Sequence, residues 1–205
     1  MSNDRGDPEE RRGKLARDRR PVRPTKLAHV VRRTSRFEEL VAWYQTVFEA
    51  RIVHSNGMLA FLTYDDEHHR FAIVGIPGPE AQPPRAAGTD HVAFSYADLG
   101  DLLHTYERLR QAGIEPYWCI NHGPTTSLYY RDPDGSQVEL QVDNFASIED
   151  ADRWMRTEEF AANPIGVIFE PADLLARYRA GEPLESLVRR PPLPEGVSPF
   201  EMLRF

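Results

Sequence analysis

The sequence repeats one short plan of secondary structure, and this repetition constrains the fold more than any other feature. Two β-like stretches, KLAHVV at 26–31 and TDHVAF at 89–94, each place a histidine immediately before a valine. A stretch with helical spacing of apolar residues follows each of them, and three strand-like stretches follow each helix. The helical positions are Phe37, Leu40, Val41, Tyr44, Val47 and Phe48, then Leu99, Leu102, Leu103, Tyr106 and Leu109. The predicted strands are 51–54, 59–64 and 71–76, then 115–120, 127–131 and 137–142. The pattern predicts an α+β fold of two βαβββ modules.

Proline and charge divide the chain into four regions. We predict a disordered charged arm at 1–25, a first module at 26–80, a second module at 88–145 and a C-terminal extension at 146–205. The extension does not repeat the modular plan. SIEDADRWMRTEEFAANP predicts one helix, and PADLLARYRAGEP predicts a second helix that ends at Gly181. Its apolar residues need a surface to cover, either on the same subunit or on a partner. They include Trp154, Phe160, Ile165, Val167 and Phe169.

Composition excludes several classes of protein. The net charge is -7, and residues 1–25 hold eight basic against five acidic side chains, so the remainder is about 10 units negative. An acidic body argues against nucleic-acid binding. No apolar run approaches the roughly 20 residues that span a bilayer, and the first residues do not resemble a secretion signal. The single cysteine, Cys119, excludes an intrachain disulfide and favours a reducing, cytoplasmic location.

A carboxylate stands inside the last predicted strand. The tetrapeptide Asp-Pro-Asp-Gly at 132–135 suits a β-turn that closes a hairpin. Alternation along 137–142 then places Glu139 on the face opposite Val138 and Leu140. A buried carboxylate needs a compensating partner. That partner could be an arginine such as Arg131, or a divalent metal shared with the strand histidines, each of which could also be an ordinary hydrogen-bonded core residue.

Residues 26–145 resemble the vicinal oxygen chelate superfamily and, within it, the short single-domain form of the type I extradiol ring-cleaving dioxygenases. The most specific stretch is YYRDPDGSQVE at 129–139, which is similar to the Tyr-x-Arg-Asp-Pro-Asp-Gly motif that leads to the family's glutamate ligand. The resemblance implies that the two modules pair into a half-barrel. It also implies that His29, His91 and Glu139 bind the metal. The last strand of the first module, HRFAIVGI, offers no further carboxylate, so three protein ligands leave positions open for substrate and oxygen.

The same resemblance implies the chemistry and the remaining site residues. The cofactor would be Fe(II), with Mn(II) as an alternative, and the substrates would be a small aromatic diol and O2. His69 would move a proton, Tyr129 would orient the diol and His122 would stabilise charge on oxygen. A one-residue slip of the strand would replace His69 by His68. Other functions within this fold are a dioxygenase acting on an enol or 2-oxo acid, a glyoxalase-like metal-dependent lyase or isomerase, and a non-catalytic small-molecule-binding protein. Association into a homo-oligomer is also compatible with the sequence.

Overall fold

The first half of the chain forms a four-stranded mixed sheet, here called the first sheet. A computed structural model of the protein describes residues 22–78, 83 and 87–204. The first sheet has the order β1-β4-β3-β2, in which β1 is parallel to β4 and the other pairs are antiparallel. Its elements are β1 (Val30–Thr34), α2 (Phe37–Phe48), β2 (Arg51–Ser55), β3 (Leu59–Thr63) and β4 (Phe71–Gly75).

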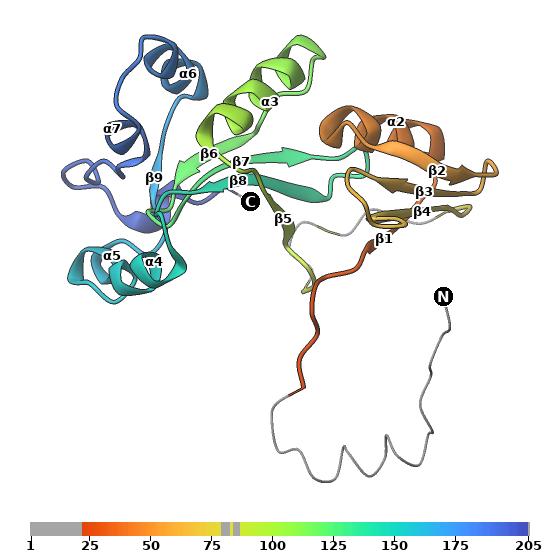
Figure 1. Ribbon diagram of the computed structural model, residues 1–205, viewed down its shortest axis with the longest axis horizontal. Helices are drawn as coiled ribbons and strands as arrows, with labels where there is room; N and C mark the ends of the chain where they lie inside the picture. The colour runs from red at the N-terminus through yellow and green to blue at the C-terminus, as the bar shows by residue number, and fades with distance from the viewer. Residues whose placement is uncertain (1–21, 79–82, 84–86, 205) are drawn as a thin grey trace, which may run out of the picture.

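The second half repeats this arrangement and adds one strand. The second sheet has the order β5-β8-β7-β6-β9. Its elements within the repeat are β5 (His91–Ser95), α3 (Leu99–Gln111), β6 (Trp118–Asn121), β7 (Thr125–Arg131) and β8 (Gln137–Asp143). Figure 1 shows α2 and α3 lying over their own sheets on the same side of the molecule. The predicted α+β fold with two βαβββ repeats is confirmed. The predicted start of the first strand is wrong, because β1 begins at Val30 and His29 precedes it.

Each helix packs through the apolar positions that the sequence indicates. In α2 the buried residues include Leu40, Tyr44 and Val47, which follow the three- and four-residue spacing of one helical face. The N-terminus of α3 is fixed by Asp98, whose side chain accepts a hydrogen bond from the backbone N–H of Asp101 at 2.9 Å. Capping of this kind satisfies a donor that the first turn of a helix leaves free. The helices therefore hold one face of each sheet against the core.

The Asp132–Gly135 turn closes the hairpin between β7 and β8 and also connects the modules. The backbone N–H of Gly135 donates to the carbonyl of Asp132 at 2.8 Å, and Gly135 has a φ of 82°, which favours glycine. The Asp132 carboxylate is buried and accepts a hydrogen bond from Arg32 of β1 at 3.0 Å. The turn thus sets the register between β7 and β8 in the second module, while Asp132 contacts Arg32 of the first module.

A cluster of aromatic side chains from both modules packs the two modules together. The rings of Phe48 and Phe94 lie 4.5 Å apart between centroids, and those of Phe71 and Phe94 lie 5.6 Å apart. Phe48 and Phe71 belong to the first module and Phe94 belongs to β5 of the second. Contacts of this type add roughly 0.5–1.5 kcal/mol each beyond the area that they bury. The relative placement of the sheets therefore has an apolar basis.

The C-terminal extension packs on the second module of the same chain. It contains α4 (Ile148–Trp154), α5 (Glu158–Ala162), β9 (Val167–Ile168), α6 (Pro171–Arg179), α7 (Leu184–Val188) and the 3-10 helix η1 (Pro199–Met202), which gather at the end of the second sheet (Figure 1). The prediction of one helix over SIEDADRWMRTEEFAANP is wrong, because Thr157 begins a second helix by accepting a hydrogen bond from the N–H of Phe160 at 3.3 Å. The predicted helix before Gly181 is confirmed.

The extension also supplies a strand that the sequence pattern does not reveal. Two residues, Val167 and Ile168, pair antiparallel with Asn121 and Ile120 at the outer edge of β6.

Of the predicted charged arm at 1–25, residues 1–21 lie outside the described part of the chain, as do positions 79–82 and 84–86 of the connector. In the part that the structure describes, every helix is too short or too polar to cross a membrane.

Candidate active site

Glu139 lies on the polar face of β8 and meets His91 of β5. Only 4% of Glu139 is exposed, and its Oε2 lies 3.0 Å from Nε2 of His91. The neighbours Val138 and Leu140 are buried on the opposite face, as alternation predicts. Arg131 does not pair with the glutamate, because its guanidinium lies over the ring of Tyr117, 4.1 Å from the centroid. The partner of the buried carboxylate in this chain is therefore a histidine.

Charge is stabilised on both members of this pair. Burial raises the pKa of Glu139, but hydrogen bonds from His91, Ser127 and Tyr129 outweigh it and hold the pKa below the usual value. The hydrogen bond to Glu139 raises the pKa of His91 to about 9, and Asp90 adds to this effect while burial opposes it. The pair is thus an imidazolium and a carboxylate near neutral pH. A divalent cation bound between the same atoms would take the place of the imidazole proton.

Tyr129 on β7 and His122, which directly follows β6, extend the site beyond Glu139. Tyr129 stands directly opposite Glu139 in the pairing of β7 with β8, and its hydroxyl lies 3.1 Å from Nε2 of His122. Nδ1 of His122 contacts the backbone carbonyl of Ile165. Burial is the main cause of the altered pKa values, since it raises that of Tyr129 and lowers that of His122. Both groups are therefore neutral near pH 7.

His29 and His69 lie together in the first module. Their ring centroids are 4.5 Å apart, and His69 also stacks on Phe61 of β3 at 4.6 Å. His69 is half-buried, whereas His68 is exposed and contacts His69 through its Nδ1 at 2.6 Å. Burial lowers the pKa of His69, and the nearby His29 and His68 lower it further. Of the two adjacent histidines, His69 is the one whose ring lies beside His29.

The predicted residues thus form two groups. His91, Glu139, Tyr129 and His122 are brought together at the second sheet, while His29 and His69 lie in the first module, just before β1 and β4. Across residues 22–78, 83 and 87–204, no three histidine, cysteine, aspartate or glutamate side chains are gathered in a way that could hold a metal ion. The structure does not bring His29 together with His91 and Glu139.

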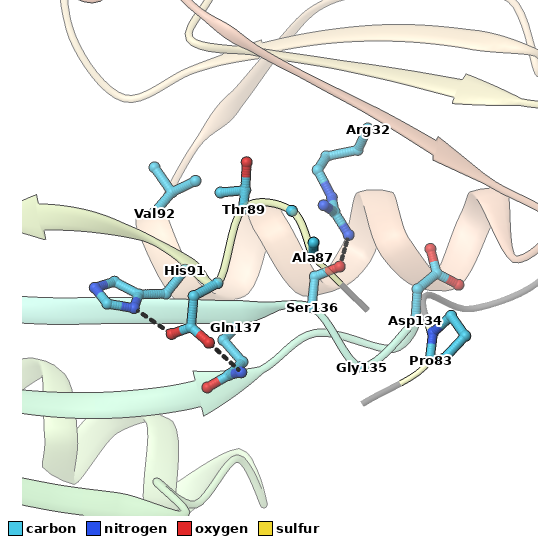
Figure 2. A pocket seen from close by; sticks show the side chains of 12 residues that line it. Arg32, Pro83, Ala87, Thr89, His91, Val92, Asp134, Gly135, Ser136 and Gln137 are labelled. Carbon is cyan, nitrogen blue, oxygen red and sulfur yellow. Dashed lines mark hydrogen bonds and ion pairs between the residues drawn. The ribbon is translucent and has the colours of Figure 1, made fainter. Parts of the chain in front are cut away.

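A cleft of about 430 Å³ opens between the modules beside His91. In Figure 2, Arg32 reaches Ser136 from the first module. His91 and Gln137 both contact the carboxylate of Asp90. Oδ2 of Asp90 lies 2.8 Å from Nδ1 of His91, so this carboxylate orients the ring that faces Glu139. Asp90 was not among the site residues predicted from the sequence, although it immediately precedes His91.

Comparisons with known proteins place this arrangement in a family. The model of the Glyoxalase/Bleomycin resistance protein/Dioxygenase superfamily matches residues 26–140, which comprise both modules up to β8. The chain belongs to this superfamily. The match ends just after Glu139, so the C-terminal extension lies outside the part that the superfamily shares.

Two curated members of the superfamily from Rhodococcus globerulus are similar to most of the chain. Biphenyl-2,3-diol 1,2-dioxygenase 2 is 48% identical over 163 residues, which cover 79% of this chain and 86% of the relative. Biphenyl-2,3-diol 1,2-dioxygenase 3 is 46% identical over 168 residues, which cover 80% and 88%. The predicted resemblance to extradiol dioxygenases is confirmed by these relatives.

A solved structure supports the fold. The fosfomycin resistance protein FosX from Listeria monocytogenes, in complex with Mn(II) and sulfate, superposes with a TM-score of 0.50 and 18% identity, covering 64% of this chain and 99% of its own. At this level of identity the similarity concerns the fold alone. The predicted superfamily fold is thus supported by sequence and by structure.

Proposed function

We propose that this chain is an extradiol dioxygenase that opens the aromatic ring of a catechol-type diol with O2. The observation that carries the proposal is the similarity to two biphenyl-2,3-diol 1,2-dioxygenases over about four fifths of the chain. The side chains on the second sheet support it, because an imidazole, a carboxylate, a phenol and a second imidazole converge there. Biphenyl-2,3-diol is the first candidate substrate.

The residues of the second sheet suit a metal centre. His91 and Glu139 present an imidazole nitrogen and a carboxylate oxygen 3.0 Å apart, and the glutamate is buried with its pKa lowered, so that it remains anionic. We propose Fe(II) as the ion and Mn(II) as the alternative, because histidine and carboxylate ligands discriminate weakly between them. Bound there, the ion would hold the diol and O2 together and let electrons pass from the diol to oxygen.

We propose His29 as the third ligand, supplied by a second copy of the chain. Within the described part of one chain, His29 lies beside His69 and is not gathered with His91 and Glu139 into a group that could hold a metal ion. In the described residues, β1 and β5 each pair with a neighbour on one side only, so both sheets end in an open strand beside the proposed ligand histidines. Open edges of this kind can pair with another chain. A symmetric dimer would form two equivalent sites and would deliver His69 with His29.

Each remaining side chain has a proposed role. The hydroxyl of Tyr129 touches both His122 and Glu139, so it can donate to the oxygen of a diol that enters between them. His122 would accept a proton on Nε2 and, as an imidazolium, would then stabilise negative charge that develops on oxygen. His69, whose pKa is lowered, is neutral near pH 7 and can accept a proton from the diol.

Oxygen uptake tests the activity. Fe(II)-loaded, anaerobically purified protein would receive catechol, 3-methylcatechol or biphenyl-2,3-diol, and a yellow ring-opened product would be followed together with oxygen. Glu139→Ala should abolish both signals, whereas Asp143→Ala, which removes an exposed carboxylate from the same strand, should retain them. Turnover without oxygen consumption would instead indicate a lyase or isomerase. Ligand binding without turnover or metal would indicate a binding protein.

A mixture of two variants tests the shared site. His29→Ala and Glu139→Ala would be purified separately and then co-refolded. If copies share sites, a mixed dimer contains one site with neither substitution, and activity returns. If all ligands come from one chain, each variant lacks a ligand at every site and the mixture stays inactive.

A further inference from the structure

A buried arginine of the C-terminal extension donates a hydrogen bond to the backbone carbonyl of His122. Arg190 follows α7, and 4% of its side chain is exposed. Its Nη1 donates to the carbonyl of Asn163 at 2.6 Å and to the carbonyl of His122 at 3.3 Å, while Nη2 donates to the carbonyl of Glu159 at 3.1 Å. One guanidinium therefore connects the loop after α5 to the backbone of a proposed catalytic residue. The fork of donors on arginine suits this convergence of carbonyls.

An aromatic contact holds the same arginine from a second direction. The guanidinium carbon lies 4.7 Å from the centre of the Trp154 ring, within the range of a cation–π interaction. Trp154 also contacts Gly123, where an added Cβ atom would overlap the ring. The residue after His122 is thus packed against the tryptophan that supports Arg190.

The loop at 163–166 is rigidly organised. Asn163 is buried, and its Oδ1 accepts from the N–H of Ile165 at 3.2 Å and from the N–H of Gly166 at 2.9 Å. Its Nδ2 donates to the carbonyl of Gly166 at 2.9 Å. These bonds leave the carbonyl of Ile165 directed at Nδ1 of His122.

This contact fixes the tautomer of the imidazole. A carbonyl oxygen can only accept a hydrogen bond, so Nδ1 of His122 must carry a proton. In the neutral ring the lone pair is then on Nε2, which faces the hydroxyl of Tyr129 at 3.1 Å. In the opposite tautomer the unprotonated Nδ1 of His122 would face the carbonyl oxygen of Ile165, and neither atom could donate a hydrogen bond. The orientation of a histidine is commonly decided by the bond that its second nitrogen makes.

We propose that the C-terminal extension is a positioning device for His122, in which the carbonyl of Ile165 selects the Nδ1-protonated tautomer and Arg190 anchors the loop that carries this carbonyl. Arg190 is a positioning residue, since its contact with His122 is limited to the backbone carbonyl of that residue. The effect of the tautomer on ring cleavage rests on the proposed function. The tautomer itself rests only on the contact between His122 and the carbonyl of Ile165. The match to the superfamily ends at residue 140, so the device belongs to the part of the chain outside the shared repeat.

Nitrogen-15 NMR of the full-length protein, kept free of paramagnetic metal, tests the tautomer directly. The signals of His122 would be identified by their disappearance in His122→Gln. The expected result is a protonated Nδ1 and an unprotonated Nε2 in the parent protein. A parent protein with the proton on Nε2 would overturn the proposal without the need for any variant.

Two neighbouring arginines provide a matched pair of variants. Arg190→Met should move the His122 shifts toward a mixture of tautomers and lower kcat about ten- to a hundredfold with little change in KM, the range for losing a group that orients an active-site histidine. Arg190→Lys should recover part of both effects. Arg189→Met, at an exposed position, should change neither. Unchanged His122 shifts in folded Arg190→Met would refute the role of Arg190.

The two proposals can fail separately. The predicted tautomer in a protein that consumes no oxygen with any diol would reject the dioxygenase and keep the positioning device. Ring cleavage by a protein whose His122 is protonated on Nε2 would keep the dioxygenase and reject the device.

Discussion

Replacing Asp132 by alanine should destabilise the protein strongly, because one carboxylate serves both the hairpin turn and the contact between modules. Its Oδ1 accepts from the N–H groups of Asp134 and Ser136 at 3.0 and 2.9 Å, and its Oδ2 accepts from Arg32 at 3.0 Å. Alanine leaves these three donors without their acceptor, and each unsatisfied buried donor costs roughly 1–3 kcal/mol. Arg32 keeps 23% side-chain exposure and a contact with Ser136, so we expect the lower end for the three donors together, about 3 kcal/mol.

Asparagine at the same position should be much better tolerated. Burial raises the pKa of Asp132 above its usual value, even though Arg32 opposes the shift, so the negative charge is itself unfavourable in the folded protein. The amide retains an oxygen that can accept from the two N–H groups of the turn. Asp132→Asn should therefore lose only about 1 kcal/mol, the net value of one ordinary hydrogen bond.

Thermal and guanidinium unfolding, followed by circular dichroism, would measure these differences. For a chain of this size, about 3 kcal/mol lowers Tm by roughly 6–12 °C, and about 1 kcal/mol lowers it by roughly 2–4 °C. Asp143→Ala, at an exposed end of β8, is the control and should stay close to the parent. Equal losses for Asn and Ala would refute the reasoning, because the charge on Asp132 would then matter more than its acceptor atoms.

Three further predictions concern the site and its supports. Tyr129→Phe should lower kcat/KM about ten- to a hundredfold, since the hydrogen bond that its hydroxyl would donate to an ionised diol contributes roughly 1.5–3 kcal/mol; product formation would check the loss, and unfolding curves would show that the variant folds. Burial raises the pKa of Cys119 to about 12, so the thiolate is scarce below that pH, and a disulfide reagent at pH 8 should react only after unfolding; rapid reaction of the folded protein would contradict this. Gly123→Ala should cost more than 2 kcal/mol, because φ is 102° and Trp154 occupies the space. Gly113→Ala has a similar φ of 76° but open space, and should cost about 1 kcal/mol in the same unfolding assay.

The burial of Glu139 and its position opposite Tyr129 could be predicted from the sequence because two local rules determine them. Alternation in a strand assigns each side chain to a face, and the Asp132–Gly135 turn sets the register that puts Tyr129 opposite Glu139. Both rules involve only neighbouring residues. The burial of the carboxylate and its position next to a tyrosine therefore follow from a short stretch of sequence.

The association of the modules could not be predicted in the same way. Alternation assigns His91 to one face of β5, and His29 lies immediately before β1, but neither fact indicates whether the two sheets meet within one chain or between two. The contact of Ile165 with His122 was also out of reach, because a backbone carbonyl has no signature in the sequence. β9, with two residues, is too short for a period to be recognised.

The pairing of β9 with β6 has a consequence for the chain during its synthesis. Ile120 receives its outer neighbour, Ile168, only after the intervening residues have left the ribosome. Until then, a nascent chain with both repeats complete still presents the edge of β6 to other chains, a known route to aggregation. Premature termination before residue 167 should leave that edge permanently open, so truncated products should need chaperones more than the full-length protein does.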